Sequence, residues 1–163
     1  SQDQRIFHIA DRNKKGIVIL VNKWDLLDKS TETAKKAEEQ IKSKIAPFTD
    51  IPIVFVSALE KQRLLKGLET AIFVHKNRTQ KIATSVLNEV MLPLIEHNPP
   101  PATKGKYIQI KYCTQLPTDT PTFVFFANLP QYIKEPYKRY IENQLRQHFT
   151  FSGVPIQIYF RKK

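Results

Sequence analysis

Two short apolar runs, each followed by a polar loop, constrain the fold of this sequence more than any other feature. Residues 17–21 read Ile-Val-Ile-Leu-Val, and residues 53–56 read Ile-Val-Phe-Val. Continuous runs rich in β-branched residues, without polar alternation, are typical of strands that are covered on both faces in a parallel sheet. We therefore expect two buried parallel strands, the first of them central in its sheet.

Amphipathic stretches surround these two runs. Residues 5–12, 30–46 and 63–75 carry apolar side chains at intervals of three or four among many charged ones, which is the spacing of a helix with one buried face. The predicted order over residues 1–77 is αβαβα. Such alternation predicts a parallel α/β unit with right-handed crossovers and with ligand-binding loops beyond the carboxyl ends of its strands.

Residues 78–163 predict a second, smaller α+β unit. A helix over 82–97 ends at Asn-Pro-Pro-Pro, because proline lacks a backbone donor and the residue before it avoids helical geometry. A second helix over 136–149 is expected to begin near Pro136. Strands are expected over 108–112, 123–127 and 156–161. In the first of these strands Ile108, Ile110 and Tyr112 alternate with polar residues and should face the core. The order is αββαβ.

The charge balance favours a polyanionic partner. The chain of 163 residues has a net charge of +11. Residues 1–77 hold 14 basic and 10 acidic residues (+4), and residues 78–163 hold 12 and 5 (+7). A cationic surface gains affinity for nucleic acid when each neutralised phosphate releases condensed counterions. The alternative is that the excess charge only keeps the chain soluble.

The first apolar run is followed directly by Asn22-Lys23-Trp24-Asp25. In the N-K-x-D pattern of guanine-nucleotide-binding proteins, the carboxylate accepts hydrogen bonds from N1–H and the exocyclic amine of guanine, which adenine cannot offer. Asp25 would take that role. Lys23 would lay its methylene stem on the base, and Asn22 would brace neighbouring loops through its amide. Trp24 is interpreted as a packing residue.

The second run ends in a complementary segment, Ser57-Ala58-Leu59. This segment is similar to the S-A-[KL] element, whose backbone N–H meets O6 of guanine. The two loops are expected to converge, since neighbouring parallel strands end at the same edge of a sheet. The alternative interpretation is that both are ordinary loops at strand ends.

Several segments together resemble one family, the EngA/Der ribosome-assembly GTPases, over essentially the whole chain. The resemblance rests on residues 16–19, 22–27 and 51–59, and further on 87–88, 99–101, 137–143, 153–156 and 160–161. It implies that residues 1–77 are the C-terminal part of the second GTPase domain and that residues 78–163 are a KH-like domain. The implied partners are the large ribosomal subunit, ribosomal RNA and upstream GTPase domains of the same protein, in the cytoplasm.

The phosphate-handling elements of a GTPase are missing from the sequence. None of the four glycines begins a G-x-x-x-x-G-K-[ST] loop, and no D-x-x-G element occurs. Phosphoryl transfer depends on those elements and on the Mg²⁺ ion that they position. The chain is therefore expected not to hydrolyse GTP alone. GTP or GDP with Mg²⁺ would be the ligand of the longer parent protein, with no cofactor tightly bound to this part.

The second unit also lacks the G-x-x-G loop with which KH domains clamp a nucleic-acid backbone. Two surfaces could replace it. The helical set of candidate RNA contacts consists of Lys138, Arg139 and Arg146. The sheet set consists of Tyr107, Lys111, Tyr159 and Arg161, and Gln109 lies on the same side of the sheet. Tyrosines among cations suit base stacking and phosphate contact. The sheet set could instead pack against a GTPase domain, so the helical set is preferred.

Other chemistries find little support in the sequence. Cys113 is the only cysteine, which excludes an internal disulfide. The four histidines are scattered without acidic or cysteine neighbours at ligand spacing, so no metal site is expected. The longest apolar runs are too short to cross a bilayer. The competing function is a nucleotide-independent RNA-binding or interdomain packing module.

Overall fold

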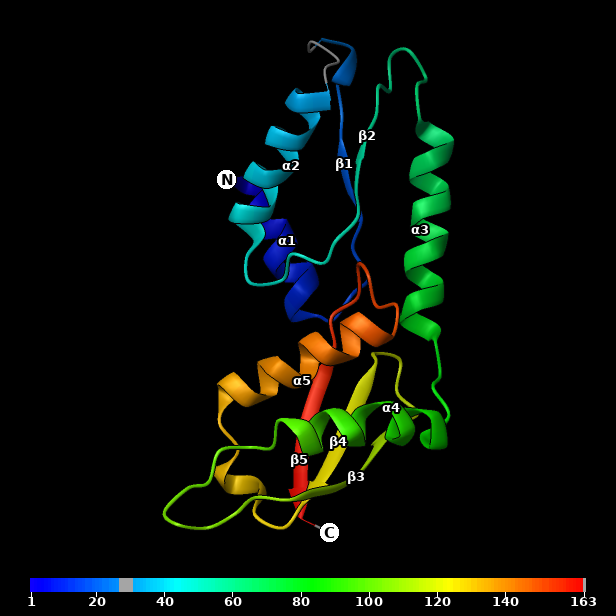
Figure 1. Cartoon of the computed structure of the whole chain (residues 1–163). Coiled ribbons are helices and arrows are strands. Elements are labelled where there is room, and N and C mark those ends of the chain that lie inside the picture. Colours follow the sequence, from blue (N-terminus) through cyan, green and yellow to red (C-terminus); the bar gives the residue numbers. More distant parts are fainter. Residues whose placement is uncertain (27–30, 163) are drawn as a thin grey trace. The chain divides into compact units, whose positions relative to one another are not determined.

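The computed structural model describes residues 1–26 and 31–162 (Figure 1). Three positions used in the sequence analysis lie outside the described residues: Leu27 of segment 22–27, the expected helix start at residue 30, and the C-terminal Lys163. The chain forms two compact units. The first holds Ser1–Arg78 and Phe151–Pro155, and the second holds Thr79–Thr150 and Ile156–Lys163. The predicted α/β fold class is confirmed.

Unit 1 has the predicted order αβαβα. Its elements are α1 (Gln2–Arg12), β1 (Ile19–Val21), the short 3-10 helix η1 (Trp24–Leu26), α2 (Thr31–Ile45), β2 (Ile53–Phe55) and α3 (Leu64–Thr79). Strands β1 and β2 pair in parallel, with Ile19 opposite Ile53 and Val21 opposite Phe55. Helices α1 and α2 lie on one side of this pair and α3 on the other (Figure 1).

The core of unit 1 forms on the side of α1 and α2. Phe7, Ile17, Ile45 and Ile51 are buried there, and Ile41 packs against them. The other side of β1 is different, because Leu20 is 52% exposed. On α3, Gly67 lies against Leu20, since an added Cβ would be 3.3 Å from Leu20 Cδ2, and a glycine offers no side chain to cover it. The expectation that β1 is covered on both faces is therefore wrong for the residues described.

The expectation that β1 is central in its sheet is also wrong for the described residues, in which β2 is its single strand partner. Ile19 N–H donates to Pro52 O (3.0 Å), and Val21 O accepts from Val56 N–H (2.8 Å). Backbone groups alternate along a strand, so Val18 and Leu20 direct theirs to the edge away from β2. A continuous apolar run indicates burial in a complete sheet, and two strands do not complete one.

A segment from late in the sequence closes the other end of unit 1. Gly153 O accepts a hydrogen bond from Ile17 N–H (2.7 Å), and Gly153 N–H donates to Asp50 O (2.7 Å). The side-chain amide of Asn77 donates to Ser152 O (3.0 Å). The two bonds of Gly153 fix the start of β1 and the chain just before β2. The sequence carries no periodic signal for these two bonds, because they join backbone atoms only.

Unit 2 has the predicted order αββαβ. Its elements are α4 (Thr84–His97), β3 (Ile110–Gln115), β4 (Thr122–Ala127), the 3-10 helix η2 (Pro130–Tyr132), α5 (Glu135–His148) and β5 (Gln157–Lys162). The sheet has the order β3-β4-β5, with β4 antiparallel to β3 and parallel to β5. Helices α4 and α5 contribute fully or almost fully buried side chains, namely Leu87, Met91, Ile141 and Leu145.

Asn88 on α4 binds the outer edge of β3. Its Oδ1 accepts from Cys113 N–H (2.9 Å), and its Nδ2 donates to Cys113 O (2.7 Å). One side chain therefore satisfies both backbone groups of an edge residue, as a neighbouring strand would.

A β-bulge corrects the expected facing of β3. Ile110 pairs with Ala127, whereas Tyr112 pairs with Phe126, so Lys111 is the extra residue. Beyond the bulge the alternation is inverted. Cys113 is fully buried and Tyr112 is 41% exposed, so the prediction that Tyr112 faces the core is wrong. The alternation rule fails here because it assumes an uninterrupted strand.

We predict that Gly153→Ala destabilises the chain by about 3 kcal/mol, because it combines a positive φ with overpacking. Gly153 has φ +77°, and an added Cβ would lie 2.6 Å from Val74 Cγ2 and 2.7 Å from Ile17 O. Gly105→Ala is the matched control, since Gly105 has φ +71° with nothing within 4 Å. It should cost only about 1 kcal/mol. Urea unfolding measures both, and equal losses would contradict the assigned role of Gly153.

Candidate functional site

The two polar loops that follow β1 and β2 meet at the carboxyl ends of these strands. Beyond the strand pair, Trp24 N–H donates to Val56 O (3.1 Å), so the first turn of η1 is fixed to the end of β2. Ser57, the next residue, is 1% exposed. The geometry therefore brings together the two segments that were predicted to converge, residues 22–25 and 57–59.

Asn22 connects the two loops directly. Its Oδ1 accepts a hydrogen bond from Ala58 N–H at 3.0 Å. This is the kind of contact expected of a bracing amide, since the side chain of one loop holds the backbone of the other. It also occupies the Ala58 N–H, so O6 of a guanine would have to share that donor with Asn22.

The remaining residues of the first loop differ in exposure. Lys23 is exposed and has φ 62°, a left-handed conformation that reverses the chain directly after Asn22. Trp24 is buried against Phe55, with ring centroids 4.3 Å apart, which agrees with a packing role. Asp25 lies in η1 and is half-buried. The buried Trp24 therefore anchors the loop at a position between Lys23 and Asp25, the two residues predicted to contact a base.

The second loop is a tight turn that presents Ala58 and Leu59. Ser57 Oγ accepts from Glu60 N–H (3.2 Å), and the backbones of Ser57 and Gln62 exchange two hydrogen bonds (3.2 and 2.9 Å). Leu59 is 88% exposed. The loop is thus held by its own backbone, with an apolar side chain left at its tip.

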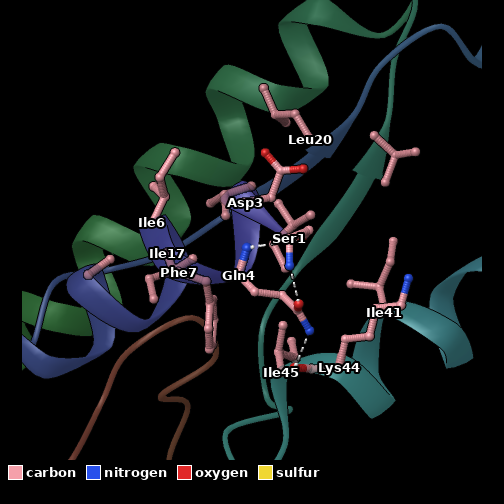
Figure 2. A pocket seen from close by; sticks show the side chains of 14 residues that line it. Ser1, Asp3, Gln4, Ile6, Phe7, Ile17, Leu20, Ile41, Lys44 and Ile45 are labelled. Atoms are coloured by element: carbon pink, nitrogen blue, oxygen red, sulfur yellow. Dashed lines mark hydrogen bonds between the residues drawn. The ribbon is translucent and has the colours of Figure 1, made fainter.

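A groove of about 500 Å³ runs beside the free edge of β1, between α1 and α2 (Figure 2). Its apolar lining includes Ile6, Phe7, Ile17, Ile41 and Ile45. At one end Gln4 accepts from the amino terminus (2.7 Å) and donates to Lys44 O (3.4 Å). The groove is therefore lined both by apolar side chains and by the backbone of β1 on the edge away from β2. This surface is distinct from the two polar loops.

The structure separates the predicted RNA contacts into groups with different surroundings. On α5, Lys138 lies 4.0 Å from Glu135, and Arg146 pairs with Glu142 at 3.2 Å, which leaves Arg139 as the exposed cation of the helical set. Carboxylates are thus interspersed with the helical cations.

In the sheet, Tyr159 is paired with Val124 and Arg161 with Phe126. Tyr112 pairs with Phe126 from the other side, and the two rings lie 5.9 Å apart. Tyr159, Arg161 and Tyr112 therefore share one face. Lys111 sits at the bulge, and Gln109 and Tyr107 lie before β3. The position of Tyr112 was missed because the sequence does not reveal the bulge.

Among the described residues, the other reactive groups do not gather into a second site. The Cys113 thiol is fully buried, and burial raises its pKa to about 12, so it stays protonated. Burial, with a smaller contribution from Tyr140, also raises the pKa of Tyr137, whose hydroxyl donates to Asn98 O. Within residues 1–26 and 31–162, no three metal-ligating side chains gather. No described helix is long and apolar enough to span a membrane.

The chain thus combines a parallel α/β unit, in which an N-K-x-D loop is braced to the neighbouring loop, with a small αββαβ unit. Residues 81–161 match the family model described as "KH-domain-like of EngA bacterial GTPase enzymes, C-terminal". The chain belongs to the EngA/Der family.

The similarity to individual relatives extends beyond the KH-like domain. The chain is 63% identical to the GTPase Der of Flavobacterium johnsoniae over 162 residues, which cover 99% of this chain and 37% of that protein. It is 62% identical to the GTPase Der of Christiangramia forsetii over the same shares, and 61% identical to that of Bacteroides fragilis, with 100% of this chain and 38% of the relative covered. The chain thus spans under two fifths of the length of these curated relatives.

Proposed function

We propose that unit 1 supplies the guanine-reading part of a GTP-binding site, and that the chain acts within a GTPase of large-subunit ribosome assembly. The hydrogen bond between Asn22 and Ala58 is the observation that carries this proposal. It holds the loops at 22–25 and 57–59 together. In this arrangement Asp25 accepts from N1–H and the amine of guanine, and Lys23 covers one face of the base.

The described residues fit the base of GTP but not its phosphates. The loops at 22–25 and 57–59 offer an acceptor and backbone donors, while the sequence has no glycine-rich phosphate loop. Mg²⁺ would supply charge neutralisation at the β- and γ-phosphates in the longer protein. The role of this chain is therefore selection of the base, and turnover requires residues outside it. Isolated, it should show no saturable GTP hydrolysis.

We predict that Asp25→Asn abolishes the preference for guanine nucleotides in the longer protein, because the change replaces an acceptor with a donor. Loss of a bidentate, charge-assisted contact should weaken GTP binding about 100-fold relative to ATP. Glu60→Gln is the control, since it removes an equal charge from an exposed neighbour in the second loop. Competition titrations of GTP against ATP measure the effect. An unchanged preference in Asp25→Asn would remove the role given to Asp25.

The free edge of β1 is a candidate binding place for upstream residues of the same protein. The matched relatives are much longer than this chain, and the groove beside β1 combines apolar side chains with unpaired backbone groups. An extended, β-branched segment satisfies both requirements, because it adds a strand and fills the groove. We propose that an upstream segment of the GTPase domain occupies this edge.

Amide hydrogen exchange tests this occupant. When the upstream GTPase segment is present in the same polypeptide, exchange at Val18 and Leu20 should slow at least about tenfold, since their N–H groups gain partners. Ile19 is the internal control, because its N–H already donates to Pro52 O. Unchanged exchange at Val18 and Leu20 would show that the segment lies elsewhere.

Unit 2 is proposed to contact ribosomal RNA in the cytoplasm through charge. Its net charge and the lack of a G-x-x-G clamp favour phosphate contacts with little sequence preference. The carboxylates beside Lys138 and Arg146 weaken the case for the helical set, so we now favour the sheet set. The alternative function is an interdomain packing module without RNA contact.

We predict that log affinity for structured ribosomal RNA falls linearly with log salt, with a slope of about −0.7 to −0.9 for each neutralised phosphate. Lys111→Glu with Arg161→Glu should weaken binding strongly, and Lys138→Glu with Arg139→Glu should weaken it less. The two pairs are matched in charge change. Filter-binding titrations over a salt series measure both. Salt-independent binding, or insensitivity to both pairs, would favour the packing module.

A further inference from the structure

One end of the unit 2 sheet gathers positive charge from separate segments. The register places Arg161 beside Phe126 and Lys162 beside Ala127, while Lys111 lies at the bulge opposite the same two residues of β4. Neighbouring strands are about 4.8 Å apart, so the backbones of these three residues lie within roughly 10 Å of one another, with the side chains of Arg161 and Lys162 on opposite faces of the sheet. The end of the sheet that holds Ala127 is therefore cationic.

A tight turn stands next to this end. Thr103 and Lys106 exchange two backbone hydrogen bonds, of 3.1 and 3.0 Å, across Lys104 and Gly105. Lys104 has φ 52° and Gly105 has φ 71°, and positive φ at both central positions defines a type I′ turn. Such a turn is stiff, because both cross-turn bonds are made. It holds the exposed residues Lys104 and Lys106 at a fixed spacing.

Asn128 fastens the chain that leaves this turn. Its Oδ1 accepts from Gln109 N–H (2.8 Å), and its Nδ2 donates to Tyr107 O (3.1 Å). Asn128 directly follows Ala127, so the turn is attached to the cationic end of the sheet. With its backbone held in this way, Tyr107 leaves its side chain 85% exposed. Because the backbone of Tyr107 is held in place while its ring is exposed, the ring is available to stack on a flat ligand.

The residues around Tyr107 and the turn at 103–106 favour a nucleic acid, which has phosphates and planar bases, over an acidic protein as the ligand. Between residues 99 and 134 the sequence has one acidic residue, Asp119, and it lies in the connection from β3 to β4, at the opposite end of both strands. Lys106 also lies 6.0 Å from the ring centroid of Tyr132. Cations beside an exposed aromatic ring are what single-stranded nucleic acid needs, since phosphates bind the cations and a base stacks on the ring.

We propose that the turn at 103–106 and Tyr107 form a grip for single-stranded RNA, in which Lys104 and Lys106 hold the phosphates and Tyr107 stacks on one base. The grip takes the place of the missing G-x-x-G loop, with a stiff hairpin turn between cations instead of glycines. This proposal rests on the proposed RNA contact of unit 2. It adds Lys104 and Lys106, which belong to neither the helical set nor the sheet set, to Tyr107 of the sheet set.

Substitutions that keep the turn provide the test. Asn-Gly is the preferred pair for a type I′ turn, so Lys104→Asn removes the charge without disturbing the backbone. Fluorescence anisotropy with a short single-stranded RNA and a duplex of equal length measures affinity over a salt series. Lys104→Asn with Lys106→Gln should reduce the magnitude of the salt slope by about 1.5. The control, Lys35→Gln with Lys36→Gln on α2, removes equal charge and should leave the slope unchanged.

Tyr107 is tested by a different readout. Tyr107→Ala should weaken binding to the single strand about tenfold, with the salt slope unchanged and the duplex little affected, and Tyr107→Phe should restore binding. Normal RNA binding in all turn variants, together with loss in Lys111→Glu/Arg161→Glu or Lys138→Glu/Arg139→Glu, would overturn the grip and leave the RNA contact standing.

Two further outcomes separate this proposal from others. If wild-type protein binds neither RNA, the proposed RNA contact itself fails. If polyglutamate competes as well as RNA and Tyr107→Ala has no effect, the surface binds acidic chains in general and the grip is refuted. Circular dichroism establishes whether each variant is folded. If a Tyr107 variant is unfolded, the salt slope of Lys104→Asn with Lys106→Gln still tests the grip.

Discussion

The parallel pairing of β1 with β2 is the constraint on which unit 1 depends. It aligns the ends of two strands that are separated by a whole helix in sequence, so the loops after them meet without further adjustment. Asn22 then joins those loops at one end, and the backbone of Gly153 joins the strand starts at the other. The loop at 22–25 is only as well placed as this pairing, because two strands of three residues have few other contacts to hold them.

Much of this architecture follows from local patterns. The periodicity of apolar residues predicted the order of helices and strands in both units, and the position of the N-K-x-D segment after an apolar run predicted that it would meet the next strand-ending loop. What local patterns could not supply were contacts between distant backbone atoms. The segment around Gly153 has no pattern that relates it to Ile17, and its place in unit 1 appears only in three dimensions.

The facing of β3 and the exposure of β1 show two other limits of sequence reasoning. One extra residue at Lys111 inverts the alternation beyond it, and nothing in the composition of the strand marks that residue. The apolar run of β1 correctly predicts a strand, yet Leu20 in it is 52% exposed among the residues described. A continuous apolar run therefore predicts a strand more reliably than it predicts how far each face of that strand is covered.

The double hydrogen bond from Asn88 to Cys113 has a consequence for how this chain behaves in solution. An uncovered strand edge is a template on which another molecule can extend a sheet, and the amide of Asn88 blocks that template on β3. Nothing equivalent protects Val18 and Leu20 among the described residues. The edges of the two sheets thus differ in how open they are to another strand, and the edge of β1 is the more open one among the described residues.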